Sequence, residues 1–209
     1  MVNLIINMPK LILLTLGIIL SFSISANEKI RGHYKLVGNK PESKNLKKIV
    51  FEEFINFGCS HCNKLHKASK DFRKKFANQI EFVDIPIVFK GQDDSPLRLY
   101  YVARKIGKGN LIKDELFKAS FIHGVNVFDP GITNYLARSL GIRKEFQAEK
   151  SQQWVNKLIQ EGQRKSLIYG VRGTPTVVIQ HALKMDIGKY GSMDEFLKKI
   201  PETIEDLMY

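Results

Sequence analysis

The pattern of apolar and polar positions predicts a strand, a helix and a second strand in the first half of the chain. Residues 49–55 and 80–89 are apolar, β-branched runs typical of buried strands. Between them, apolar residues recur at three- and four-residue steps from Leu65 to Phe76, which predicts a helix. Strand, helix and strand of these lengths form a βαβ unit with parallel strands. Pro86 is expected to mark a bulge or the end of ladder pairing.

The spacing of apolar residues becomes typical of helices in the middle of the chain and typical of strands again near its end. Four helices are expected, the last of them broken, over residues 95–106, 111–121, 132–140 and 146–167. His123 is expected to be a helix cap or a surface residue. Strands are predicted at 33–37, 176–179 and 183–187, and a last helix begins at the capping box of Ser192 and Glu195. This order predicts an α/β fold: a mixed central sheet flanked by helices, with a helical segment inserted into it.

The first 26 residues are typical of a secretory signal peptide. Lys10 precedes an apolar run from Leu11 to Ile24, and small residues follow, so cleavage is expected near Ser25 or Ala26. An uncleaved membrane anchor is the alternative, because the apolar region is long if it is counted from Leu4. In either case the folded part lies outside the cytoplasm, where disulfides form and persist.

The chain is strongly basic, with a net charge of +12, which becomes +11 once the single lysine of the signal is removed. This charge suits acidic lipid headgroups or acidic unfolded clients. Lysines spread over helix faces also simply keep a protein soluble. Nucleic acid is not an expected partner, because no basic run is interleaved with aromatic residues.

The chain contains two cysteines, Cys59 and Cys62, and they lie where the first long strand turns into its helix. Free backbone N–H groups and the helix dipole stabilise an anion at such a position. The dipole is worth about 0.3–2 kcal/mol, or on the order of one pKa unit, too little alone to bring a thiol from about 8.5 to well below neutrality. His61 can supply a further positive charge or N–H donor. The hypothesis is that Cys59 attacks in thiol–disulfide exchange and Cys62 resolves.

Other uses of the pair remain open. A structural disulfide here would close a loop holding only Ser60 and His61, so it would stabilise little. A zinc half-site has the right spacing, with His66 four residues on, but no second Cys or His pair follows. Haem attachment is excluded because Asn63 follows Cys62. A carrier of a soft ion such as Cu(I), using the cysteines with His61 or His66, is the rival from a different functional class.

Three features together give the chain a family resemblance. They are the segment from Phe57 to Cys62 after a strand, the helical insertion, and Gly173-Thr174-Pro175 before a strand. On these features the chain resembles the DsbA-like thiol:disulfide interchange proteins of the thioredoxin superfamily, over essentially its whole mature length. The resemblance implies a thioredoxin-like domain over residues 27–94 and 170–209, with a helical subdomain at 95–169.

The resemblance also implies roles for individual residues. Pro175 would be cis and pack beside the two sulfurs, although composition alone favours an ordinary trans proline. Thr174, beside Gly173, would offer its backbone to an extended client as an added strand would, and its N–H to the Cys59 sulfur. Glu53 would be a buried acid that assists proton transfer at Cys62, but strand alternation alone leaves a surface charge equally open. Glu52, on the opposite face, is expected to be solvated.

The implied activity is that of a protein-disulfide oxidoreductase which introduces disulfides into exported proteins in the periplasm. The redox-active disulfide Cys59–Cys62 would be its redox group, with no bound cofactor. The expected partners are reduced exported proteins and a membrane quinone-linked partner of the DsbB type, and the expected state is a monomer. Two departures leave an isomerase or reductase open: Ser60-His61 replaces the Pro-His of the best-known oxidase, and Thr174 replaces its Val.

Overall fold

The protein is described by a computed structural model that covers residues 30–41, 46 and 48–209. The predicted signal peptide at residues 1–26 lies outside the described residues. None of the helices in the described part of the chain is both long and apolar enough to cross a membrane.

The strands form one mixed sheet in the order β1-β5-β4-β2-β3. Their bounds are β1 (Lys35–Leu36), β2 (Ile49–Ile55), β3 (Ile80–Pro86), β4 (Thr176–Ile179) and β5 (Leu183–Asp186). β2 pairs with β3 in parallel and with β4 antiparallel. The predicted βαβ unit is therefore confirmed, and the ladder ends at Pro86 as expected. β1 is shorter than the predicted strand at 33–37, because its pairing with β5 is limited to two residues.

The helices follow the predicted periodicity closely, including the break in the fourth. Their bounds are α1 (Ser60–Lys75), α2 (Ser95–Lys105), α3 (Gly109–Phe121), α4 (Pro130–Ser139), α5 (Arg143–Glu149), α6 (Gln153–Ile168) and α7 (Met193–Met208). A short 3-10 helix, η1 (Ile187–Lys189), precedes α7. Ser192 caps α7 by accepting a hydrogen bond from the backbone N–H of Glu195 at 3.1 Å, which confirms this half of the capping box, while the Glu195 carboxylate accepts from the Gly191 N–H at 2.8 Å.

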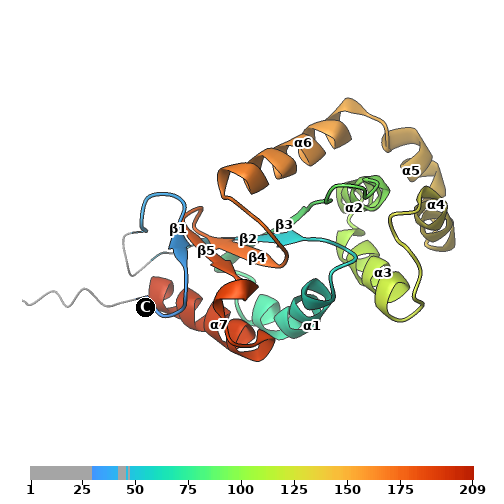
Figure 1. The fold of residues 1–209 in the computed structure, drawn as a ribbon. Coiled ribbons are helices and arrows are strands. Elements are labelled where there is room, and N and C mark those ends of the chain that lie inside the picture. The colour runs from blue at the N-terminus through green and yellow to red at the C-terminus, as the bar shows by residue number, and fades with distance from the viewer. Residues whose placement is uncertain (1–29, 42–45, 47) are drawn as a thin grey trace, which may run out of the picture.

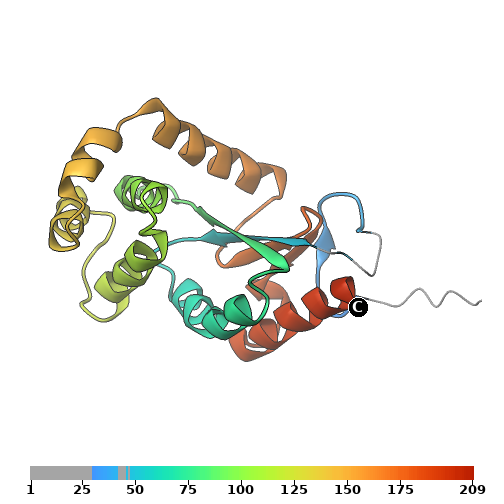
Figure 2. The ribbon, with the colours of Figure 1, turned by 180° about the vertical axis from the view of Figure 1, so that it is seen from behind.

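The helices cover the two faces of the sheet unequally. α1 and α7 lie against one face, while α6 runs across the other, as Figures 1 and 2 show from opposite sides. α2–α5 gather beyond the end of the sheet at which β2 runs into α1 (Figure 1). All five helices from α2 to α6 come between β3 and β4 in the chain, as predicted for an insertion.

Three apolar cores are present among the described residues; the one around Phe54 and Val178 lies apart from the reactive segment, and the other two each contain part of it. One core lies between the sheet and the α1/α7 layer, and includes Phe51, Leu65 and Phe196. The other is formed mainly by the inserted helices, yet it includes Phe57 and Cys62. The turn between β2 and α1 is thus packed against the inserted helices as well as attached to the sheet.

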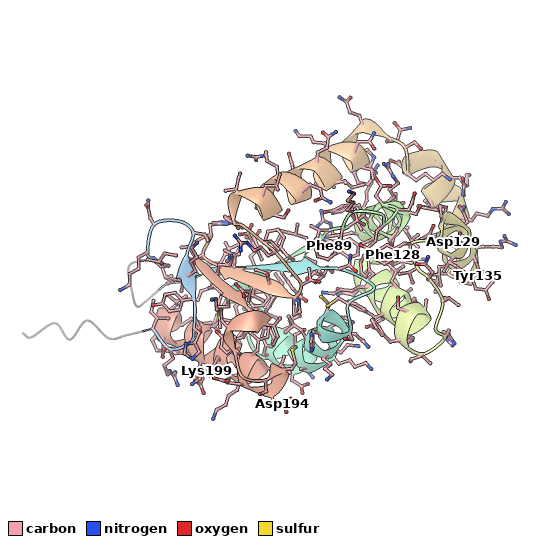
Figure 3. All side chains as sticks on the ribbon, in the orientation of Figure 1. Phe89, Phe128, Asp129, Tyr135, Asp194 and Lys199 are labelled. Atoms are coloured by element: carbon pink, nitrogen blue, oxygen red, sulfur yellow. The ribbon has the colours of Figure 1, made fainter. Side chains whose placement is uncertain are left out.

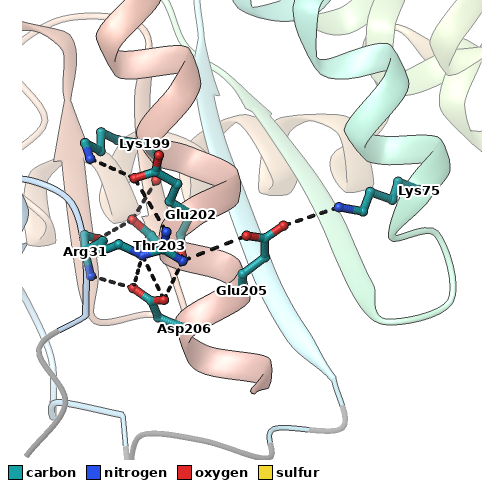
Figure 4. Close-up of polar contacts among 7 residues, drawn as sticks. All are labelled: Arg31, Lys75, Lys199, Glu202, Thr203, Glu205 and Asp206. Atoms are coloured by element: carbon teal, nitrogen blue, oxygen red, sulfur yellow. Dashed lines mark hydrogen bonds and ion pairs between the residues drawn. The ribbon is translucent and has the colours of Figure 1, made fainter.

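The start of the described chain is fastened to α7 (Figure 4). Arg31 donates from its backbone N–H and its guanidinium to Asp206, with Nη2 2.7 Å from Oδ1. Thr203 Oγ1 donates to the Arg31 carbonyl at 2.6 Å, and a Cβ on Gly32 would lie 2.7 Å from that hydroxyl. The fold is therefore anchored within a few residues of the expected cleavage site.

Candidate active site

Cys59 caps the N-terminus of α1, as its place between strand and helix predicts. Its backbone is extended, with φ −94° and ψ 117°, and its N–H donates to the Asn56 carbonyl at 3.0 Å. Its Sγ lies 3.4 Å from the backbone N–H of Cys62, one of the free N–H groups of the first helical turn. Cys59 is half-buried, so its sulfur can be approached from outside, whereas Cys62 is fully buried.

The two thiols differ strongly in acidity. A hydrogen bond from the Cys62 thiol, together with the backbone N–H groups of Cys62 and His61, lowers the pKa of Cys59 below its ordinary value, to about 5, although partial burial opposes this. Burial, and then the neighbouring Cys59, raise the pKa of Cys62 well above its ordinary value. In the reduced pair the charge therefore resides on Cys59. The imidazole of His61 and the side chain of Ser60 are exposed at the start of the helix.

The predicted proline loop meets the sulfur of Cys59. The Thr174–Pro175 peptide bond is cis, and the Thr174 carbonyl oxygen lies 3.1 Å from Cys59 Sγ. The carbonyl makes this contact, so the expectation that the Thr174 N–H would face the sulfur is wrong. Thr176 Oγ1 donates to the Gly173 carbonyl at 2.8 Å, which fixes the turn that leads into β4.

Glu53 is fully buried on the α1 face of β2, inside a cluster of charges. Its Oε2 accepts from Arg73 of α1 at 2.7 Å and from Lys113 of α3 at 3.3 Å. The same two cations bind Asp84, the residue paired with Glu53 on β3, at 2.8 and 3.0 Å. Burial opposes ionisation of Asp84, but Lys113 and Arg73 hold its pKa below the usual range. Two acids and two cations balance in the interior, so the surface-charge alternative for Glu53 is wrong.

Glu52 is also fully buried, which corrects the expectation that it would be solvated. It points to the other face of β2, where α6 covers it. Its carboxylate forms an ion pair with Lys165 and accepts from the Tyr169 hydroxyl at 3.1 Å, and His181 Nδ1 lies 2.9 Å away. Alternation along β2 correctly predicted that Glu52 and Glu53 lie on opposite faces of the sheet. It did not indicate that α6 would bury Glu52.

His66 has a partner other than the cysteines. Its Nε2 contacts Asp114 of α3, its ring stacks on Phe117 with centroids 5.3 Å apart, and burial lowers its pKa below the ordinary value. Among the residues that the structure describes, no group of three or more His, Cys, Asp or Glu side chains is arranged to hold a metal ion.

Asn56 is a residue of the site that the sequence did not single out. Its buried side-chain oxygen accepts from the Gly58 N–H at 3.0 Å, and its Nδ2 donates to the Ile87 carbonyl and to Gln92 Oε1, at 3.0 and 2.7 Å. Asn56 thus holds the turn before Cys59 against the loop after β3. An Asn shortly before a helix start was the available signal, since Asn commonly fixes turns through its side chain.

Comparisons with known proteins agree with this geometry. Residues 29–200 match the family model described as a DSBA-like thioredoxin domain. The thiol:disulfide interchange protein DsbA of Burkholderia cepacia is 24% identical over 169 residues, which cover 80% of this chain and 76% of the relative. The DsbA of Pseudomonas aeruginosa strain PAO1 is 22% identical, covering 76% of this chain and 75% of the relative.

Solved structures show the same fold. The oxidoreductase DsbA from Xylella fastidiosa superposes with a TM-score of 0.71 and 20% identity, covering 85% of this chain and 97% of that chain. A Proteus mirabilis DsbA, solved in complex with a non-covalently bound peptide PWATCDS, superposes with a TM-score of 0.64 and 20% identity, covering 87% and 97%. The architecture is therefore a thioredoxin fold with a helical insertion.

Proposed function

Because this chain belongs to the family of DSBA-like thioredoxin domains and is a protein-disulfide oxidoreductase, we propose that it introduces disulfides into exported proteins through Cys59 and Cys62. The observation that carries the direction of the reaction is the unequal acidity of the two thiols, with the Cys59 pKa at about 5 and that of Cys62 raised. A stabilised thiolate favours the reduced form, so the oxidised pair is a strong acceptor of electrons.

The proposed cycle begins with the Cys59–Cys62 disulfide. A client thiolate attacks the accessible sulfur of Cys59, a client–Cys59 disulfide forms, and the Cys59–Cys62 bond breaks with its electron pair on Cys62. Cys62 then takes up a proton, since its raised pKa favours the thiol. A second client thiolate attacks the client sulfur and releases Cys59 as a thiolate. The client has lost two electrons and the enzyme has gained them.

Glu53 is proposed to assist the proton movement at Cys62. Its Oε2 takes both cationic partners, while its buried Oε1 has no hydrogen-bond partner among the described residues. A carboxylate with one oxygen free can accept and return a proton. The cations Arg73 and Lys113 hold the carboxylate in place through its other oxygen, at 2.7 and 3.3 Å.

Gly173, Thr174 and Pro175 are proposed to bind the client beside the reacting sulfur. Gly173 is exposed, and the Thr174 carbonyl already lies 3.1 Å from Cys59 Sγ. An extended client can pair with this backbone as an added strand. The peptide bound by the Proteus mirabilis relative, which itself contains a cysteine, supports this class of substrate.

The cellular setting is proposed from the sequence and the relatives. The chain is exported to the periplasm by residues 1–26 and acts as a monomer. Its thioredoxin-like domain comprises residues 27–94 and 170–209, with the helical subdomain at 95–169. The redox-active disulfide serves in place of a bound cofactor, and a membrane quinone-linked partner of the DsbB type returns the pair to the oxidised state.

The equilibrium of the purified protein with glutathione tests this proposal. A reduction potential less negative than about −180 mV, the value typical of disulfide isomerase, is expected for an oxidase. A more negative value would contradict the oxidase assignment and favour the isomerase or reductase that Thr174 leaves open. The Cys59→Ser variant, which cannot form the pair, is the blank for the measurement.

A further inference from the structure

A buried amide ties the turn before Cys59 to the loop that follows β3. Asn56 is 2% exposed, and both hydrogens of its Nδ2 have acceptors, the Ile87 carbonyl at 3.0 Å and Gln92 Oε1 at 2.7 Å. Its Oδ1 accepts from the Gly58 N–H at 3.0 Å. Inside a protein such bonds are strong and an unpaired polar group is costly, so this network holds the amide in place.

The main chain of Asn56 bears on both cysteines. Its carbonyl accepts from the Cys59 N–H at 3.0 Å, which closes the turn from Asn56 to Cys59. Its backbone N–H also lowers the pKa of Cys62, against the larger effect of burial. The Cys59 sulfur then lies 3.4 Å from the Cys62 N–H and 3.1 Å from the Thr174 carbonyl oxygen. A shift of this turn would therefore change the contacts of the reacting sulfur.

Gln92 determines which way the Asn56 amide points. Gln92 Oε1 accepts from Asn56 Nδ2 and, at 2.9 Å, from the Phe89 N–H, while the Gln92 N–H donates to the Phe89 carbonyl at 3.0 Å. The loop is thus closed on itself, and Figure 3 labels Phe89 where the sheet meets the inserted helices. A reversed Asn56 amide would set its oxygen against Gln92 Oε1 and its N–H groups against the Gly58 N–H. The observed orientation is therefore the paired one.

We propose that Gln92 is a positioning residue for the exchange reaction, because it orients the Asn56 amide that fixes the turn leading into Cys59. This inference rests on the proposed function, since it assigns Gln92 a part in the reactivity of Cys59. The contacts run from Gln92 Oε1 to Asn56 Nδ2, and from Asn56 Oδ1 to the Gly58 N–H. Without Gln92 the amide loses the partner that orients it, and the Cys59 sulfur is held less firmly over the N–H groups that stabilise its charge.

The pH dependence of Cys59 alkylation in the reduced full-length protein tests the proposal. Gln92→Ala removes the acceptor and leaves Asn56 and both cysteines in place. We expect it to raise the midpoint of Cys59 alkylation by about half a unit to one unit, the scale of one hydrogen bond. In the same variant the equilibrium with glutathione should move toward the Cys59–Cys62 disulfide by about three- to tenfold, because a less stabilised thiolate favours the reduced form less.

Two further variants separate positioning from stability. Gln163→Ala is the matched control, since Gln163 Nε2 donates to the Val88 carbonyl at 3.3 Å and its loss also removes an amide bond to the segment after β3. It should lower the free energy of unfolding but leave the Cys59 midpoint unchanged, because its bond lies outside the Asn56 network. Asn56→Ala should raise the midpoint at least as much as Gln92→Ala. Adding Gln92→Ala to it should cause no further rise, since Gln92 acts through Asn56.

The results that overturn the proposal are distinct from those that overturn the function. If Gln92→Ala keeps the wild-type midpoint, or if Gln163→Ala shifts it as much, Gln92 only stabilises its loop. If Gln92→Ala still shifts the midpoint in the Asn56→Ala protein, Gln92 does not act through that amide. If Cys59 of the wild-type protein titrates as an ordinary thiol and exchanges no disulfide with glutathione, the exchange function itself fails, whatever Gln92 does.

Discussion

Cys59 and Cys62 lie on the same first turn of α1, yet they belong to different regions of the molecule. Cys59 is at the rim, capping the helix and facing the Thr174 carbonyl at 3.1 Å. Cys62 is in the core of the inserted helices with no exposed surface. The start of α1 supplies N–H donors to the accessible sulfur of Cys59, while the core shields the sulfur of Cys62 from solvent. Two chemically identical residues thereby acquire opposite preferences for charge, which divides the roles of attack and resolution.

Serine in place of each cysteine should give the largest and most unequal effects. Cys59→Ser removes the sulfur that a client can reach, so exchange should fall to the uncatalysed rate. Cys62→Ser leaves Cys59 able to react but removes the resolving thiol, so covalent complexes with client should accumulate. Refolding of a reduced client, followed by mass spectrometry of trapped products, distinguishes the two. Trapping by Cys59→Ser through Cys62 would contradict the division of roles.

Glu53→Gln should have the next largest effect, on both stability and the step at Cys62. Removal of this charge leaves Arg73 and Lys113 with one buried acid, Asp84, between them, and such losses cost about 3–5 kcal/mol. Denaturant unfolding measures this cost. Glu81→Gln is the control, since its exposed pair with Lys48 should contribute about 0.5 kcal/mol or less.

The same Glu53→Gln variant also tests the proposed proton transfer. In this variant, Cys62 should attack the client–Cys59 disulfide, and so reform the Cys59–Cys62 bond, about 10²-fold more slowly. This factor is the lower end of general acid–base contributions. Alkylation of Cys59 in the variant should keep its wild-type midpoint. An unchanged rate at Cys62 would assign Glu53 to stability alone.

The reduced protein should melt above the oxidised protein, and the difference should depend on pH. The Cys59 pKa is about 5 in the fold and about 8.5 in an unfolded chain, so the thiolate stabilises the reduced fold fully above about pH 8.5. This contribution shrinks as pH falls and is lost through pH 5. Each kcal/mol corresponds to roughly 2–4 °C at this chain length. Calorimetry of both forms from pH 4 to 9 measures the gap, and an oxidised form that melts higher at pH 8 would refute it.

His61→Ala should have the smallest effect of the changes predicted here. The backbone N–H of His61 helps to lower the pKa of Cys59, and that group is retained in the variant. The exposed imidazole can add only a solvent-screened charge, so its loss should raise the Cys59 pKa by about one unit or less. Thiol titration by absorbance measures the shift. A rise of several units would transfer the main stabilisation of the thiolate from the Cys62 thiol and the backbone N–H groups to this ring.

The sequence predicted what depends on neighbouring residues and missed what depends on distant ones. The strand at 49–55, the cap at Cys59 and the interruption between α5 and α6 follow from local pattern. The burial of Glu52 depends on Lys165 and Tyr169, more than a hundred positions away, which alternation along one strand cannot reveal. Gly58 was visible in the sequence, but the ring that lies closest to the place of its missing side chain belongs to Phe128, three helices further along the chain. The contact of the Thr174 carbonyl with Cys59 likewise joins residues that are 115 positions apart.

The most direct test is the pH dependence of Cys59 alkylation by iodoacetamide in the reduced full-length protein. Only the thiolate reacts, so the rate follows its ionised fraction. The account predicts a midpoint near pH 5, with Cys62 unmodified over the same range. A midpoint at or above about 8.5, the ordinary value for cysteine, would contradict it.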